Sequence, residues 1–203
     1  MGIRIKSDAD FLDAVNEYGI LPFWDENGFS AWQFSDVNFM KFWYMRERIV
    51  NSKKVAYGKF VHNKSTFVRL DLLPALCALR RDGYDFDSLC DEGRVSNREK
   101  TVMDAVDAAS EPAPSYALSK SIGIKGYDTI VTSLQNKTYL CVTFKHSNMG
   151  SALLSRPETL FGYDFVRSAY NKTNEQNAAL LAKTKGLQQF TDTEVKKILT
   201  PTV

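Results

Sequence analysis

Apolar side chains recur at helical spacing in three short runs between residues 96 and 136 and alternate with polar ones after residue 138. The first run follows Ser96 and Glu99, which have the spacing of a capping box. Its members are Val102, Met103, Val106 and Ala109. Pro112 and Pro114 then follow, and proline both lacks a backbone donor and disfavours helical geometry in the residue before it. The pattern predicts a helix followed by a turn.

Two more helices and a strand are predicted after this turn. Ser115 can cap a short helix that Gly123 ends. The next helix has one apolar face with side chains at i, i+3, i+4 and i+7, namely Tyr127, Ile130, Val131 and Leu134. Residues 138–144 are rich in β-branched and aromatic side chains and predict a strand, with a second strand at 152–155. Two short helices about a tight turn, followed by strands, indicate a winged helix-turn-helix.

The N-terminal part has a different pattern. Ser7 and Asp10 open a helix that Gly19 ends. All three tryptophans and several other aromatic residues follow between residues 23 and 44, and we interpret this cluster as core rather than as a base-stacking surface, because aromatic side chains bury large areas. Residues 55–61 and 65–70 flank a short polar connection and predict a β-hairpin.

A helix starting at Asp71 is expected to end at residues 80–83, where cations meet the negative helix pole and glycine stops the helix. The acidic residues 84–93 read as a solvated linker. The predicted fold class is therefore α+β. Residues 1–93 form a small α/β part with a hairpin, and residues 94–203 form the winged helix-turn-helix with C-terminal helices, including one capped by Thr191 and Glu194.

The composition limits the partners. The chain has 26 Lys plus Arg against 24 Asp plus Glu, so its net charge of +2 gives no general field for anions, and nucleic-acid affinity must come from a local patch. The three cysteines lack CxxC spacing, which argues against a disulfide framework or a zinc site and favours a reduced cytoplasm. We predict no metal, no cofactor, no signal peptide and no membrane span.

The predicted third helix supplies the candidate binding residues. In a winged helix this element normally enters the major groove, while flanking cations neutralise phosphates and polar side chains read base edges. The expected partner is double-stranded DNA, and the expected contacts are Lys120, Lys125, Thr129, Thr132, Ser133, Asn136, Lys137 and Lys145. Any solvated helix face carries similar residues, and Asp128 would repel phosphate. A unit that docks a protein partner or forms a homodimer therefore stays open as an alternative.

Several short segments of the sequence resemble the AlkZ-related bacterial proteins, which are akin to winged-helix DNA glycosylases that excise alkylated bases or unhook crosslinks. The matching segments are Ala56–Phe60, Arg80–Phe86, Thr132–Gln135 with Thr138–Leu140, and Pro157-Glu158 with Gly162–Asp164. The resemblance spans about Tyr57 to Tyr170. The glycosylases combine tandem winged helices with a β-barrel, an assembly that we do not expect within 203 residues.

The resemblance also implies a candidate for catalysis. In the glycosylases, a glutamine–apolar–glutamine motif positions water near the sugar carbon of a damaged nucleotide. The nearest match here is Gln135-Asn136-Lys137, which keeps only the first glutamine. Lys137 could attack the sugar as an amine, but no neighbour evident in the sequence would lower its pKa. We therefore favour a non-catalytic DNA-binding protein in a repair or regulatory setting, with a reduced alkylbase glycosylase acting through Gln135 as the alternative.

Overall fold

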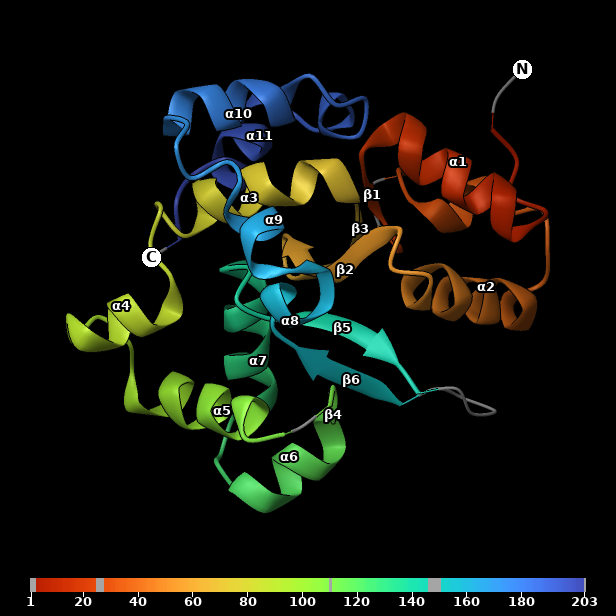
Figure 1. Ribbon diagram of the computed structural model, residues 1–203. Coiled ribbons are helices and arrows are strands. Elements are labelled where there is room, and N and C mark those ends of the chain that lie inside the picture. Colours follow the sequence, from red (N-terminus) through yellow and green to blue (C-terminus); the bar gives the residue numbers. More distant parts are fainter. Residues whose placement is uncertain (1–2, 25–27, 110, 146–150, 203) are drawn as a thin grey trace.

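The computed structural model describes residues 3–24, 28–109, 111–145 and 151–202 and combines helices with two small antiparallel sheets (Figure 1). This confirms the α+β class. The first sheet has the strand order β1-β3-β2. Its strands are β1 (Ile20–Pro22), β2 (Val55–Val61) and β3 (Lys64–Arg69), and its neighbouring helices are α1 (Asp8–Tyr18), α2 (Phe39–Asn51) and α3 (Leu73–Arg80).

Helices cover both faces of this sheet. Successive side chains of a strand point to opposite faces, so Phe67 packs with α1 and α2 while Val68 packs with α3. The predicted aromatic core is confirmed on the first of these faces, where the rings of Phe23 and Phe42 stack with centroids 5.3 Å apart. Trp24 and Phe39, at the edge of the cluster, remain exposed.

The hairpin between β2 and β3 turns through His62 and Asn63. Their φ angles are +48° and +60°, so both lie in the left-handed region. Two-residue hairpin loops favour this geometry because it matches the twist of the flanking strands, and asparagine tolerates it better than most residues. The turn confirms the predicted hairpin and directs its tip toward α7.

The second sheet lies within residues 86–155. The helices and strands of this segment are α4 (Phe86–Asp91), α5 (Asn97–Asp107), β4 (Ala113–Pro114), α6 (Ser115–Ile122), α7 (Tyr127–Asn136), β5 (Cys141–Phe144) and β6 (Ala152–Ser155). The capping box of Ser96 and Glu99 opens α5, and Gly123, with φ +64°, ends α6, as predicted. The strand order is β4-β6-β5. A helix, a strand, two helices and two strands in this order are compatible with a winged helix.

Four local predictions need correction. The predicted strand at 138–144 begins only at Cys141, because Thr138 has φ +62° and its carbonyl binds Arg81. Ser115 makes no cap and is the first residue of α6. Asp71 lies in a 3-10 turn before α3. The acidic segment is no linker, because Asp85 caps α4 and its carboxylate also pairs with Arg167 at 2.7 Å.

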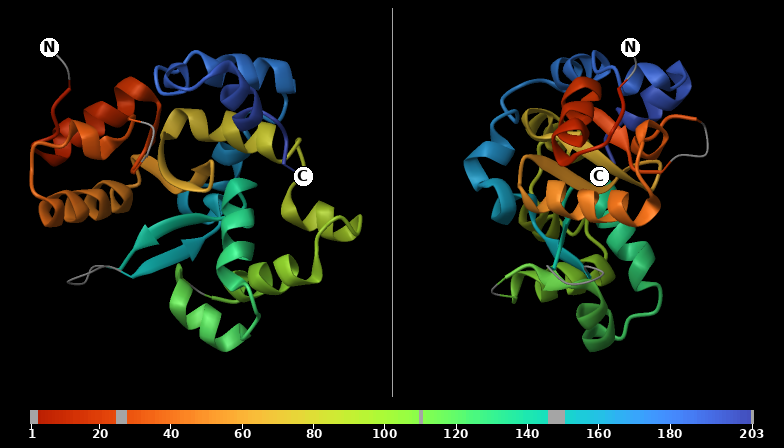
Figure 2. Two further views of the ribbon diagram at one scale, coloured as in Figure 1. Left: turned by 180° about the vertical axis from the view of Figure 1, so that it is seen from behind. Right: turned by 90° about the vertical axis from the view of Figure 1, so that its right-hand side faces the viewer.

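The C-terminal helices pack on α3 rather than on the second sheet (Figure 2). They are α8 (Pro157–Phe161), α9 (Tyr163–Arg167), α10 (Asn174–Ala182) and α11 (Asp192–Ile198), followed along the chain by residues 199–202. The capping box of Thr191 and Glu194 opens α11 as predicted. The division of the chain at residues 93 and 94 stays a prediction. Across the described residues, every helix is too short or too polar to cross a bilayer.

Arg81 joins the two halves of the chain inside the protein. Its side chain is 1% exposed, and its guanidinium donates to the Thr138 carbonyl at 2.6 Å, to the Tyr170 hydroxyl at 3.1 Å and to the Glu158 carboxylate. Burial alone would lower the pKa of Arg81, but the surrounding acidic groups hold it above its usual value. The end of α3 is thereby tied to the segment after α7 and to α8.

Candidate nucleic-acid interface

Helix α7 is held between the two sheets. Its apolar face packs into the second core as the sequence predicts, with Tyr127, Ile130, Val131 and Leu134 buried. Its polar face turns toward the hairpin of the first sheet, where α7 contacts β2. Some polar side chains of α7 bind the hairpin, and the polar face of the helix also lines a cavity.

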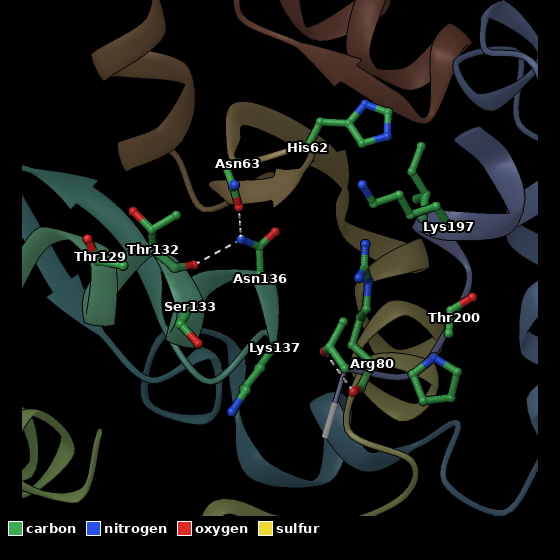
Figure 3. A pocket seen from close by; sticks show the side chains of 13 residues that line it. His62, Asn63, Arg80, Thr129, Thr132, Ser133, Asn136, Lys137, Lys197 and Thr200 are labelled. Carbon is green, nitrogen blue, oxygen red and sulfur yellow. Dashed lines mark hydrogen bonds between the residues drawn. The ribbon is translucent and has the colours of Figure 1, made fainter. Parts of the chain in front are cut away.

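A cavity of about 730 Å³ opens beside α7, and we call it the basic cavity (Figure 3). The hairpin turn, the end of α3, α7 and the segment from α11 to Thr202 form its walls. Its charged or titratable lining residues are His62, Arg80, Lys137 and Lys197, and its remaining polar ones are Asn63, Thr129, Thr132, Ser133, Asn136, Thr200 and Thr202. None of the lining residues carries a carboxylate. An anion would therefore meet no repelling charge in the cavity wall.

Arg80 is the deepest cation of the basic cavity. Its side chain is 5% exposed, and one terminal nitrogen, Nη2, donates to the carbonyl of Phe60 at 3.1 Å. Its Nε has no partner among the residues that the structure describes. Burial lowers the pKa of Arg80 to about 10, so the guanidinium still carries its charge at neutral pH. A buried arginine normally has a carboxylate partner, and here none of the described carboxylates pairs with it.

Lys137 differs from Arg80 because a carboxylate neutralises it. Its Nζ donates to Glu99 at 2.9 Å, and the same carboxylate oxygen accepts a hydrogen bond from Ser133 at 3.0 Å. Burial alone would raise the pKa of Glu99, but the hydrogen bond and charge of Lys137 outweigh burial and hold that pKa below its usual value. In Figure 3 the Lys137 side chain points away from the centre of the cavity. Its positive charge contributes little there.

The hairpin binds the middle and end of α7. The Lys59 ammonium donates to the Thr132 hydroxyl at 3.0 Å. Asn136 donates from its amide nitrogen to the side chain of Asn63 and to the carbonyl of Thr132. These contacts use side chains that the sequence assigns to DNA, so Thr132 and Asn136 already have partners within the chain.

The first turn of α7 is free of such contacts. Thr129 is exposed and lines the basic cavity. Lys125, just before the helix, is exposed, as are Lys120 on α6 and Lys145 after β5. The predicted binding residues therefore divide into two groups. Five of them line the basic cavity and three lie outside it on the surface.

Gln135 faces away from the basic cavity. It lines a second cavity of about 350 Å³, together with Tyr57, Asp128 and residues of the second sheet. Its side-chain oxygen accepts a hydrogen bond from the backbone N–H of Lys59 at 2.9 Å, and the residue is only 4% exposed. A Cβ on Gly58 would lie 3.3 Å from that oxygen, so glycine permits this close approach of β2 to α7.

Three lining residues of the basic cavity escape the sequence reasoning. The sequence places Arg80 at a helix end and His62 in a turn. Residues at helix ends and in turns can be exposed or buried, so these positions do not predict that Arg80 is buried and His62 partly buried. Lys197 lies on a capped helix far along the chain, and no local pattern brings it to α7. The signal that the sequence does offer is the pair of adjacent arginines, because one cation suffices to interact with the negative pole of a helix.

The model of a family described as AlkZ related matches residues 5–200. No curated protein and no solved structure matches the chain.

Proposed function

The chain belongs to the AlkZ-related family, and from this relationship to DNA repair we propose that it binds double-stranded DNA through the exposed start of α7 and the basic cavity beside it. The observation that carries the proposal is the position of Thr129. It lies on the exposed first turn of α7 and also lines the carboxylate-free cavity. The exposed surface and the cavity are therefore continuous along one helix.

The element order supports a winged helix as the DNA-binding unit. In this assignment α5, α6 and α7 are the three helices, and β5 and β6 flank the wing. The third helix of such a unit enters the major groove. Here only its first turns are available, because the hairpin binds Thr132 and Asn136. With few side chains free to reach base edges, we expect phosphate contacts to supply most of the affinity and sequence preference to be weak.

The test is fluorescence anisotropy of a labelled duplex across a salt series. We expect log affinity to fall linearly with log salt concentration, because phosphate contacts release counterions. Lys125→Ala should weaken binding and reduce the magnitude of the slope by about 0.9, the value for one lost phosphate contact. Lys172→Ala is the matched control, because Lys172 is an equally exposed lysine between α9 and α10. Absence of binding at low salt would contradict the proposal and favour a protein partner.

The second cavity favours a further candidate function, the release of damaged bases. The carboxamide of Gln135 and the carboxylate of Asp128 both line this cavity beside Tyr57. An alkylated purine is cationic and leaves readily, so an oriented amide that positions water can suffice for its excision. In this hypothesis Gln135 is the catalytic residue.

The test is base release from a methylated duplex, measured as strand breaks after alkali treatment. We expect release by the intact protein and none by Gln135→Ala. Because Gln135 also holds the N–H of Lys59, the variant must retain its unfolding midpoint and its duplex affinity for the result to count. Damage-independent strand breaks, or none with the intact protein, would exclude this function and leave DNA binding untouched.

A further inference from the structure

We propose that the basic cavity binds a phosphate monoester and that the natural occupant is the phosphate at the end of a DNA strand. The choice of a DNA end as the source rests on the DNA binding proposed above. The monoester itself is inferred from the cavity alone, because a free nucleotide presents the same group. The lining charges, the buried guanidinium and the depth of the site each support this inference.

The charge of the basic cavity matches a dianion. Lys137 is neutralised by Glu99, which leaves Arg80 and Lys197 as the cations of the wall that have no ion pair with a described carboxylate. Glu194 on α11 accepts hydrogen bonds from the backbone N–H and the hydroxyl of Thr191 at 2.8 Å as part of the helix cap. A phosphate monoester carries a charge of about −1.5 to −2 at pH 7, which balances two cations.

Arg80 and Lys197 are aimed at a common space. In Figure 3 the guanidinium of Arg80 and the ammonium of Lys197 point toward each other, with the His62 ring above them. Two like charges that face one cavity repel each other, and an anion between them turns this repulsion into attraction on both sides. The Nε of Arg80 is itself buried and has no hydrogen-bond partner among the described residues, so the guanidinium is incompletely solvated. An isolated buried charge is costly, and a bound anion would remove that cost.

The depth of Arg80 distinguishes a strand end from the continuous backbone. Arg80 is 5% exposed and lies at the end of α3, in a cavity that the hairpin and α11 also line. A phosphodiester within a duplex has a sugar on each side and lies along the outside of the helix, so it contacts surface cations such as Lys125. A terminal phosphate has one free side and can enter a cavity. The volume of about 730 Å³ lies in the range of small-molecule sites and leaves room for the attached nucleoside.

The walls of the cavity are fixed before any ligand arrives. The carbonyl of Arg80 accepts hydrogen bonds from the N–H and the hydroxyl of Thr202, at 3.0 and 3.1 Å. This contact ties the segment after α11 to the end of α3, and so holds the wall that carries Lys197 opposite Arg80. A preformed site binds more tightly because less order is lost on binding. The hydroxyl of Thr129, which also lines the cavity, supplies a further group that can contact phosphate oxygens.

The experiment compares one duplex with and without 5′-phosphates, by anisotropy at fixed salt, and adds titrations with inorganic phosphate and with a deoxynucleoside monophosphate. We expect the phosphorylated duplex to bind about tenfold or more tightly, the ratio for one charge-assisted hydrogen bond. Inorganic phosphate, added at constant ionic strength, should weaken binding of the phosphorylated duplex more and bring the two duplexes to equal affinity.

Two variants test the site. Arg80→Gln should abolish the preference, but it also removes the contact with Phe60 and can impair folding. Lys197→Gln avoids this difficulty, because Lys197 is exposed and makes no described ion pair. Its matched control is Lys196→Gln, the next residue on the same helix, which is exposed and does not line the cavity. We expect the preference to fall about tenfold in Lys197→Gln and to persist in Lys196→Gln.

Each remaining outcome has a distinct meaning. Equal binding of both duplexes together with no binding of the monophosphate would overturn the monoester site and leave the proposed duplex binding intact. Binding of the monophosphate, abolished by Lys197→Gln, without a preference for phosphorylated ends would support the monoester and overturn the strand end as its source. Monophosphate binding without any duplex binding would support the site and contradict the proposed function.

Discussion

Arg80 and Arg81 are adjacent in the sequence and both are buried, yet their surroundings are opposite. Arg81 has a carboxylate, two hydroxyls and a carbonyl as partners, whereas Arg80 has one carbonyl and an open cavity. The sequence predicts the helix end where both lie, but not this difference, because Glu158 and Lys197 reach them from distant segments. Burial and pairing of single residues depend on tertiary contacts that no local spacing encodes.

Glu99 gives a residue-scale prediction for pH dependence. Its pKa is lowered in the folded protein, so the unfolded chain binds more protons and the carboxylate stabilises the fold at pH values above its ordinary pKa. This stabilisation is lost as the pH falls through the lowered pKa. Urea unfolding of the protein and of Glu99→Gln should therefore differ most near neutral pH, and the gap should shrink below about pH 4, where protonated glutamate resembles glutamine. A gap that does not depend on pH would contradict this.

At the scale of elements, the hairpin turn couples backbone conformation to contact with α7. Asn63 combines a φ of +60° with a side-chain hydrogen bond to Asn136. Asn63→Ala should destabilise the fold by about 1–2 kcal/mol, because alanine disfavours the left-handed region. Asn63→Gly removes the same hydrogen bond but accepts the backbone, and it should cost less. Chemical denaturation of the two variants separates the backbone effect from the effect of the hydrogen bond. Equal losses in the free energy of unfolding would assign the whole effect to the contact with α7.

Elements with two agreeing signals are predicted well from the sequence. The helices α1, α5 and α11 each combine a capping box with apolar spacing, and all three form where expected. Helix α10 has a capping box at Thr173 and Gln176 but little apolar periodicity, so the spacing of its residues alone does not indicate it. The strand β5 starts late because Thr138 turns to meet Arg81, a contact from another part of the chain. Predictions from local sequence therefore fail where a contact with a residue distant in the sequence determines the backbone conformation.

For the whole molecule, Gly186 limits how the C-terminal helices join the first sheet. Its N–H donates to the carbonyl of Tyr18 at 2.8 Å, and a Cβ would lie 1.8 Å from the carbonyl oxygen of Ile20. Gly186→Ala should destabilise the protein by about 1–3 kcal/mol or more, because the backbone must move to admit the methyl group. Lys185→Ala, one residue earlier on the surface, is the control and should cost less than about 1 kcal/mol. Unfolding by urea checks both, and an unchanged Gly186→Ala midpoint would show that this junction can relax.

The candidate site is a property of the whole molecule as well. Four predicted binding residues of α7, and Lys137 just after it, line the basic cavity, but the groups opposite them come from α3, the hairpin and residues 197–202. Periodicity identifies the helix and its polar face because both depend on neighbours in the sequence. It cannot identify Arg80 or Lys197 as their counterparts, because that depends on how three separate segments dock. The sequence thus predicts one wall of the site.

The partners of Arg81 have a consequence for the order of events during synthesis. A ribosome releases the chain from its N-terminus, so α3 emerges well before Thr138, Glu158 and Tyr170 exist to receive the guanidinium. Until then Arg81 must stay hydrated, and the end of α3 cannot enter the core without a large electrostatic cost. Folding of the N-terminal half of the chain can therefore be completed only after the last third has been synthesised. Nascent chains that stall before residue 158 should expose α3 to chaperones and proteases, whatever the stability of the finished protein.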